Sequence, residues 1–179
     1  MYYTGNAEFT FGTGLSYSTI ALEMASAAPN TVDVTTGACE LEYTVVLRHL
    51  AGPPGKQTVL AFWKPRSPKT APDQVPLKQK LFGMPARILC LHLSLRRPCL
   101  TRRHNAGYQN AFLTEGMETT LRFTLNTDKL AVANQDGHKI VESGSEYDIV
   151  FTDGNGLEIS AALRTSGAGA RVVEAFPMA

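Results

Sequence analysis

The sequence predicts an all-β protein built as an antiparallel β-sandwich, and three observations lead to this prediction. Segments rich in β-branched residues, or alternating between apolar and polar residues, recur about every 8–12 residues. Turns containing glycine or proline separate these segments, and few segments show the period of an amphipathic helix. The chain has 179 residues, of which 44% are hydrophobic, enough for one domain with a real core.

The expected strands follow one another along the whole chain. They span residues 20–24, 32–36, 41–50, 57–63, 75–83, 117–125, 138–142, 147–151, 157–163 and 171–176. The run 41–50 is the longest and has β-branched residues at its centre. Residues 51–55 read Ala-Gly-Pro-Pro-Gly and must turn, so 57–63 is predicted to be the hairpin partner of 41–50. Trp63, the only tryptophan, is expected in the core.

Two local signals interrupt the strands in the second half of the chain. Residues 126–130 are expected to form one helical turn, with Asn126 or Thr127 as its cap. The Asn-Gln-Asp-Gly sequence at 134–137 predicts a hairpin turn. A further turn is expected at 153–156.

The stretch 9–19 is expected to organise the fold. Gly12 and Gly14 are one residue apart and suit the backbone angles of a tight turn. Apolar residues alternate around them, which predicts a half-buried extended segment that enters the core. These residues are Phe9, Phe11, Leu15 and Tyr17.

This stretch resembles the beginning of the C-terminal fibronectin type III-like domain of glycoside hydrolase family 3, the β-glucosidases and β-xylosidases. In that family a Tyr-Thr-Gly precedes Phe-Gly-x-Gly-Leu-Ser-Tyr-Thr; here 3–5 precedes 11–19, with Ser18 inserted. The family's later motifs are similar to residues 76–83, 123–125, 130–131, 136–137, 141–144 and Tyr147.

The resemblance implies an immunoglobulin-like, fibronectin type III-like sandwich over residues 15–176. Residues 1–14 would then be the tail of a preceding domain and the glycine turn, and the chain would begin inside a longer enzyme. The first eight residues also lack the basic and apolar regions of a secretory signal. The localisation therefore stays unknown, although enzymes of this family are often extracellular.

A basic segment, residues 84–107, interrupts this pattern. It holds five arginines, two histidines and two cysteines, and it has no acidic residue. The rest of the chain keeps 12 basic and 16 acidic residues, a net charge of −4, against +1 for the whole chain. One interpretation is an insertion that binds phosphate or nucleic acid, although it has no aromatic residue to stack on a base. Another is a zinc site, whose ligand spacing fits no common pattern; its ligands would be Cys90, His92, Cys99 and His104.

The third interpretation is that residues 84–107 are a translated retained intron. Joining Gly83 to Tyr108 restores the family's Leu-x-Gly-Phe-x-x-Val-x-Leu-x-x-Gly pattern over residues 81–116 without a gap. A GGT codon for Gly83 followed by the ATG of Met84 supplies a GT donor. A GCA codon for Ala106 followed by the first base of Gly107 supplies an AG acceptor, and the joined codon still encodes glycine.

The sequence indicates no catalytic site. A glycosidase needs two carboxyl groups beside the sugar bond, and in family 3 these lie on the barrel and α/β domains, which this chain lacks. Glu40 and Glu42 share one face of a strand, as solvated residues often do, and Asp153 is typical of a turn. Asp148 flanks an apolar strand. His49 and His138 lie near turns without a nucleophile at an interpretable spacing, so neither a cofactor nor a metal site is expected.

The expected function is therefore that of a non-catalytic accessory domain, whose partners are the barrel and α/β domains of a family 3 glycosidase. The net charge of +1 does not favour nucleic acid, and no apolar run is long enough to span a membrane. The proline-rich stretch 65–76 is a candidate docking loop or an ordinary surface loop. The alternatives are a stand-alone carbohydrate-binding or protein-interaction module, and an enzyme in its own right.

Overall fold

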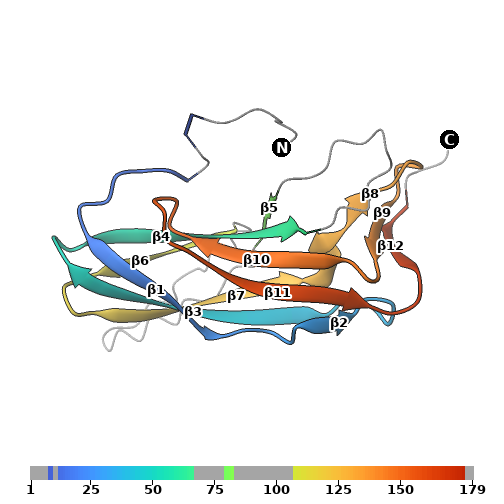
Figure 1. The fold of residues 1–179 in the computed structure, drawn as a ribbon, viewed down its shortest axis with the longest axis horizontal. Coiled ribbons are helices and arrows are strands. Elements are labelled where there is room, and N and C mark those ends of the chain that lie inside the picture. Colours follow the sequence, from blue (N-terminus) through green and yellow to red (C-terminus); the bar gives the residue numbers. More distant parts are fainter. Residues whose placement is uncertain (1–7, 10–11, 67–78, 83–106, 176–179) are drawn as a thin grey trace, which may run out of the picture.

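The computed structural model describes residues 8–9, 12–66, 79–82 and 107–175, and it shows two packed β-layers with a small third sheet at one end (Figure 1). The first layer has the order β1 (Thr19–Ser26), β3 (Glu40–Ala51), β7 (Glu118–Asn126). The second has the order β2 (Thr31–Asp33), β11 (Glu158–Ser166), β10 (Glu146–Thr152), β4 (Gly55–Pro65), β5 (Lys80–Leu81), and β6 (Tyr108–Leu113) also pairs with β4.

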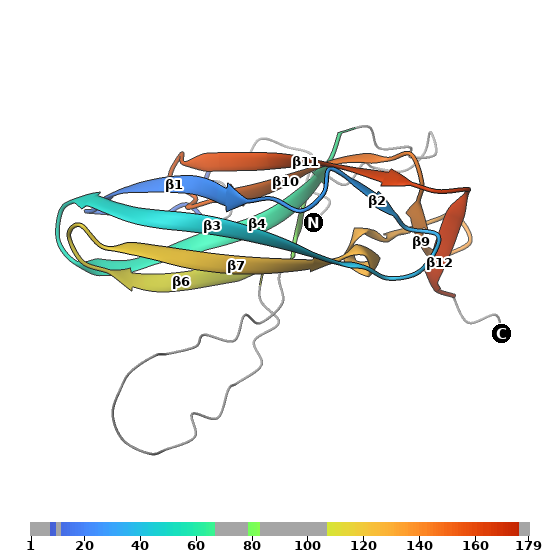
Figure 2. The same cartoon turned by 90° about the horizontal axis from the view of Figure 1, so that it is seen from below.

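The small sheet joins β12 (Ala170–Glu174), β9 (Lys139–Glu142) and β8 (Val132–Ala133). Figure 2 shows it at one end of the sandwich, opposite the turn that connects β3 with β4. Neighbouring strands are antiparallel throughout the described residues, except that β2 runs parallel to β11 over three residue pairs. The predicted all-β sandwich is confirmed.

The core lies between the two layers and follows the period of the strands. On β3 every second side chain from Leu41 to His49 points inward, and on β4 Val59, Ala61 and Trp63 do so. The ring of Phe151 lies at the centre, with ring centroids 5.7 Å from Tyr43 and 5.1 Å from Phe123. Trp63 is fully buried against Tyr147, edge to face at 5.5 Å, as the sequence predicts.

The predicted hairpin between 41–50 and 57–63 is wrong, because the two strands lie in different layers. β3 pairs with β1 and β7, whereas β4 pairs with β10, β5 and β6. Both strands present apolar side chains inward, so placing them in facing layers lets each bury that side. Pro53 and Pro54, which have no amide hydrogen to donate, occupy the crossing.

The local signals of the second half are confirmed. A 3₁₀ turn, η1 (Thr127–Leu130), begins after Asn126, whose side-chain oxygen accepts from the Asp128 amide at 2.8 Å. β8 and β9 form the hairpin predicted at 134–137, and Gly137 takes a φ of +82° at its turn.

Several predictions fall partly or wholly outside the described residues. These are the N-terminal tail before residue 8, the proline-rich loop 65–76 from residue 67 onward, the retained-intron segment up to residue 106 and the four zinc-ligand candidates Cys90, His92, Cys99 and His104. Of the strand expected at 75–83, residues 79–82 are described, and β5 occupies two of them. The strand β6 was not among the expected strands.

Candidate docking surface

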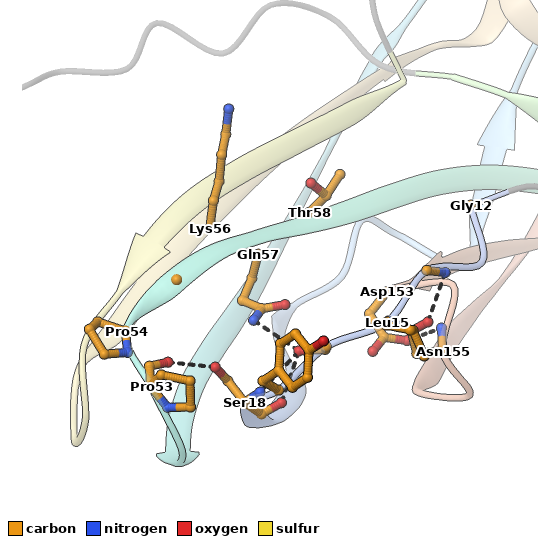
Figure 3. Close-up of a pocket in the computed structure, with 14 residues that line it drawn as sticks. Gly12, Leu15, Ser18, Pro53, Pro54, Lys56, Gln57, Thr58, Asp153 and Asn155 are labelled. Carbon is orange, nitrogen blue, oxygen red and sulfur yellow. Dashed lines mark hydrogen bonds between the residues drawn. The ribbon is translucent and has the colours of Figure 1, made fainter.

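An N-terminal arm, residues 12–18, lies across one end of the sandwich, beside the β3–β4 turn and the β10–β11 turn (Figure 3). Its backbone fits closely against the second turn. Gly12 and Gly154 both have positive φ angles, and a Cβ atom added to Gly154 would lie 2.0 Å from the carbonyl oxygen of Gly12. Glycine is therefore required where these two chain segments cross.

Hydrogen bonds fix the arm at both of its ends. The Gly14 amide donates to Asn155 Oδ1 at 3.0 Å, and Ser18 Oγ donates to the carbonyl oxygen of Pro53 at 2.6 Å. In the β10–β11 turn, Asp153 Oδ1 accepts from the amides of Asn155 and Leu157. Asp153 is thus a turn-forming residue, as the sequence indicates, and it presents Asn155 to the arm.

The predicted burial of the arm's apolar side chains is wrong. Leu15 is 94% exposed and Tyr17 is 84% exposed, and Phe9, just before the arm, is 79% exposed. The first strand begins only at Thr19. The arm contacts the sandwich through its backbone, where Gly52 packs against the carbonyl oxygen of Tyr17, and through the hydroxyl groups of Ser16 and Ser18. The apolar side chains of Leu15 and Tyr17 are left in solvent.

The arm and the two turns enclose an open cavity of about 310 Å³. Polar groups of β4 reach its wall, and Gln57 Nε2 donates to Ser16 Oγ at 3.2 Å. The buried side-chain atoms that lack a hydrogen-bond partner in the described residues lie elsewhere, on His49, Trp63 and Thr119. The cavity is open to solvent, and its lining combines polar and apolar residues. It therefore differs from the enclosed, mostly apolar pockets that usually hold a small ligand.

A second apolar feature lies on the side of β4 that faces away from the core. Leu60, Phe62 and Val150 are buried there in a small cluster of their own, with Leu81 packed against it. Two aromatic residues of β6 are exposed, Tyr108 at 45% and Phe112 at 62%. The outer face of this layer thus carries apolar side chains where a sandwich surrounded by water usually carries polar ones.

The acidic residues considered for catalysis have structural roles or lie in solvent. Glu40 and Glu42 are exposed on β3, and Glu42 lies 3.6 Å from Arg122. Asp148 is paired with Arg66 at 2.7 Å, and this hydrogen-bonded pair raises the pKa of Arg66. Among the described residues, Glu42 and Asp148 are thus each paired with an arginine, and Asp153 is used in a turn.

The two histidines considered for catalysis, His49 and His138, also have structural roles. His49 is buried, and its Nε2 lies 3.3 Å from the carbonyl oxygen of Pro53, where it supports the crossing between the layers. The amide of His138 donates to Asn134 Oδ1 at 2.8 Å in the β8–β9 turn. Among the residues that the structure describes, no group of three or more His, Cys, Asp or Glu side chains is placed to hold a metal ion. The same residues form no helix long and apolar enough to cross a membrane.

Comparison with known proteins gives a consistent result for the fold. No protein-family model matches the chain, and no curated protein matches it significantly in sequence. Among solved structures, a β-glucosidase from Listeria innocua, in complex with isofagomine, matches with a TM-score of 0.64 and 18% identity, over 89% of this chain and 18% of that chain. A β-glucosidase from Kluyveromyces marxianus matches with a TM-score of 0.65 and 16% identity, over 94% of this chain and 16% of that chain.

A β-glucosidase from Erythrobacter marinus gives a TM-score of 0.62 at 16% identity, over 91% of this chain and 18% of that one. The chain therefore has the fold of one part of these β-glucosidases and spans less than a fifth of their length.

Proposed function

We propose that this chain is the non-catalytic C-terminal accessory domain of a family 3 β-glucosidase or β-xylosidase, present as a fragment and inactive alone. The observation that carries the proposal is the match of about nine tenths of this chain to less than a fifth of each β-glucosidase. The motifs shared with the family in the same order support it. Its partners are then the barrel and α/β domains that hold the catalytic carboxylates.

The exposed apolar side chains support a docking role. Leu15 and Tyr17 project into solvent from an arm whose backbone is held by hydrogen bonds at Gly14 and Ser18. Holding the backbone of a binding segment in advance lowers the entropy cost of association. The arm also leads toward residues 1–7, which by the resemblance continue into a preceding domain.

A domain exchange tests the proposal. The matching part of the Listeria innocua β-glucosidase is replaced by this chain, and the chimera is compared with the enzyme truncated at the same point. We expect the chimera to be more soluble and to hydrolyse an aryl-glucoside faster than the truncated enzyme, and the isolated chain to hydrolyse none.

The control is a chimera that carries Leu15→Ser and Tyr17→Ser, which we expect to lose the advantage. A chimera no better than the truncated enzyme, or hydrolysis by the isolated chain, would contradict the proposal. Genomic sequence upstream of the first codon gives an independent check, because an open frame for the barrel and α/β domains would identify the fragment.

A carbohydrate-binding module is the second candidate, favoured by the exposed ring of Tyr17 beside the polar side chains of the cavity. Trp63 is fully buried, so tryptophan fluorescence is a poor reporter of binding at the surface. Calorimetric titration with gluco- and xylo-oligosaccharides is the suitable test. Saturable heat that disappears in Tyr17→Ala would favour this module over the docking role.

A further inference from the structure

Strands β5 and β6 lie end to end along the same edge of β4. Both are antiparallel to β4, so they run in the same direction. Leu81 pairs with Phe62, and Tyr108 pairs with Leu60. Only one β4 residue, Ala61, separates the two paired regions, although 26 residues separate Leu81 from Tyr108 in the sequence.

The hydrogen bonds of Ala61 are shared between the two strand ends. The Phe82 amide donates to the carbonyl oxygen of Ala61 at 2.9 Å, and the Ala61 amide donates to the carbonyl oxygen of Gly107 at 2.9 Å. In a regular antiparallel ladder one residue makes both of these bonds. Here Phe82 supplies the donor and Gly107 the acceptor, so the two residues together occupy one position of the ladder.

Close packing confirms that the two ends meet. A Cβ atom added to Gly107 would lie 2.5 Å from the carbonyl oxygen of Phe82 and 2.3 Å from the Leu81 side chain. Phe82 itself is buried in the main core, on the same side of the layer as Ala61. Two residues opposite one on the partner strand is the arrangement of a β-bulge, a common feature of sheet edges.

We infer that β5 and β6 are two halves of a single strand, into which a 24-residue segment has been inserted, and that the chain without residues 84–107 forms the same sandwich. Because residues 83 and 107 are both glycine, that deletion leaves Phe82-Gly-Tyr108 in the sequence. The remaining glycine takes the place that Gly107 holds opposite Ala61. The joined strand keeps the register of both halves, with a bulge at the junction.

This inference is independent of the proposed function, since it concerns only how the strand is built. It also fits the intron hypothesis, in which splicing leaves one glycine codon at this point. Sequencing of transcripts across codons 83–107 tests that origin. The intron explanation is wrong if all transcripts retain the segment, or if the genomic codons at its ends lack GT and AG. The structural inference does not depend on that origin, and the following experiment tests it directly.

The experiment compares the full chain with the variant that lacks residues 84–107, by circular dichroism, urea unfolding and amide exchange at Ala61. The expected result is an unchanged β-spectrum, a protected Ala61 amide and a higher unfolding midpoint. Loop closure scales with the three-halves power of loop length, so loss of a 24-residue loop raises the folding equilibrium constant by up to roughly a hundredfold.

Two matched controls locate the junction. A variant with residues 84–106 replaced by 23 glycines and serines keeps Gly107 at its close contact with Phe82 and should fold, because the inference gives the sequence of the rest of the segment no role. A variant that lacks only residues 84–106 keeps an extra glycine opposite Ala61 and should unfold at a lower urea concentration than the deletion of 84–107. A deletion of 84–107 that fails to unfold cooperatively overturns the inference, whether or not the glycine–serine variant folds. If the deletion of 84–106 instead unfolds at a higher urea concentration than the deletion of 84–107, the proposed bulge with one glycine at the junction is wrong.

Discussion

The contact between the arm and the β10–β11 turn predicts a difference between two glycine substitutions in the same turn. Gly154 and Gly156 have φ angles of +80° and +110°, so alanine at either position costs about 1–2 kcal/mol of backbone strain. An added Cβ meets nothing within 4 Å at Gly156, but at Gly154 it lies 2.0 Å from the carbonyl oxygen of Gly12. Only Gly154→Ala should therefore displace the arm.

The size of the displacement follows from the geometry. A Cβ contact shorter than 3.0 Å forces a shift, so the arm must move by on the order of 1 Å. The bond of 3.0 Å from the Gly14 amide to Asn155 Oδ1 cannot survive such a movement. Loss of a hydrogen bond worth about 0.5–1.5 kcal/mol should speed exchange of the Gly14 amide by about two- to twelvefold.

Amide exchange of Gly14, measured by nuclear magnetic resonance, is the assay, and Gly156→Ala is the matched control. Both variants should lose global stability in urea through backbone strain, and Gly154→Ala should lose up to about 1.5 kcal/mol more through the broken hydrogen bond. Faster exchange of Gly14 in Gly154→Ala alone is the expected result. Equal exchange in the two variants would refute the argument that the backbone contact with the turn holds the arm in place.

Three further predictions concern the core and its ties. Trp63→Ala should lower the free energy of unfolding by about 3–5 kcal/mol in urea titrations, because the ring is fully buried; a loss below about 1 kcal/mol would contradict that packing. Burial raises the pKa of Tyr43, so its contribution to stability is complete below its unfolded pKa of about 10 and is lost at higher pH. Above pH about 10 the free energy of unfolding should therefore fall less steeply with pH in Tyr43→Phe than in the original chain, by up to about 1.4 kcal/mol per pH unit. Equal slopes in the two proteins would contradict the burial of the Tyr43 hydroxyl group. Arg171→Ala removes hydrogen bonds to Asp128 and to the Val34 carbonyl oxygen. It should lower the free energy of unfolding, measured by thermal denaturation, by about 1–3 kcal/mol. Val172→Ala, at an exposed neighbouring position, is the control and should change this free energy little.

The strands and the core were predictable because burial imposes a period of two on the sequence. The alternation in β3 and the apolar run of β4 identify both strands, and Trp63 falls in the core as expected. The 3₁₀ turn after Asn126 was predictable from capping chemistry alone. Each of these features depends on residues close together in the sequence.

Features that depend on distant residues were not predictable in the same way. A glycine–proline turn is compatible with a hairpin and with a crossing between layers, and the choice at 51–55 depends on β10, almost a hundred residues later. The alternation at Leu15 and Tyr17 resembles that of a buried strand, yet the backbone of the arm and its serine hydroxyl groups make the contacts, and both apolar side chains stay exposed. Strand β6 was missed because its partner is β4, across the inserted segment, and its own sequence has no β-branched residue.

The crossing between β3 and β4 has a consequence for synthesis on the ribosome. Since neither strand pairs with the other, β4 receives β5 and β6 along one edge, but its other edge stays unpaired until β10 emerges, and β11 follows as late as Ser166. Such high contact order slows folding. During translation the edge of residues 60–65 that pairs with β10 therefore stays open until residues 147–152 have been made. An open strand edge of this kind can pair with another chain, so the nascent protein is most prone to wrong pairing in that interval.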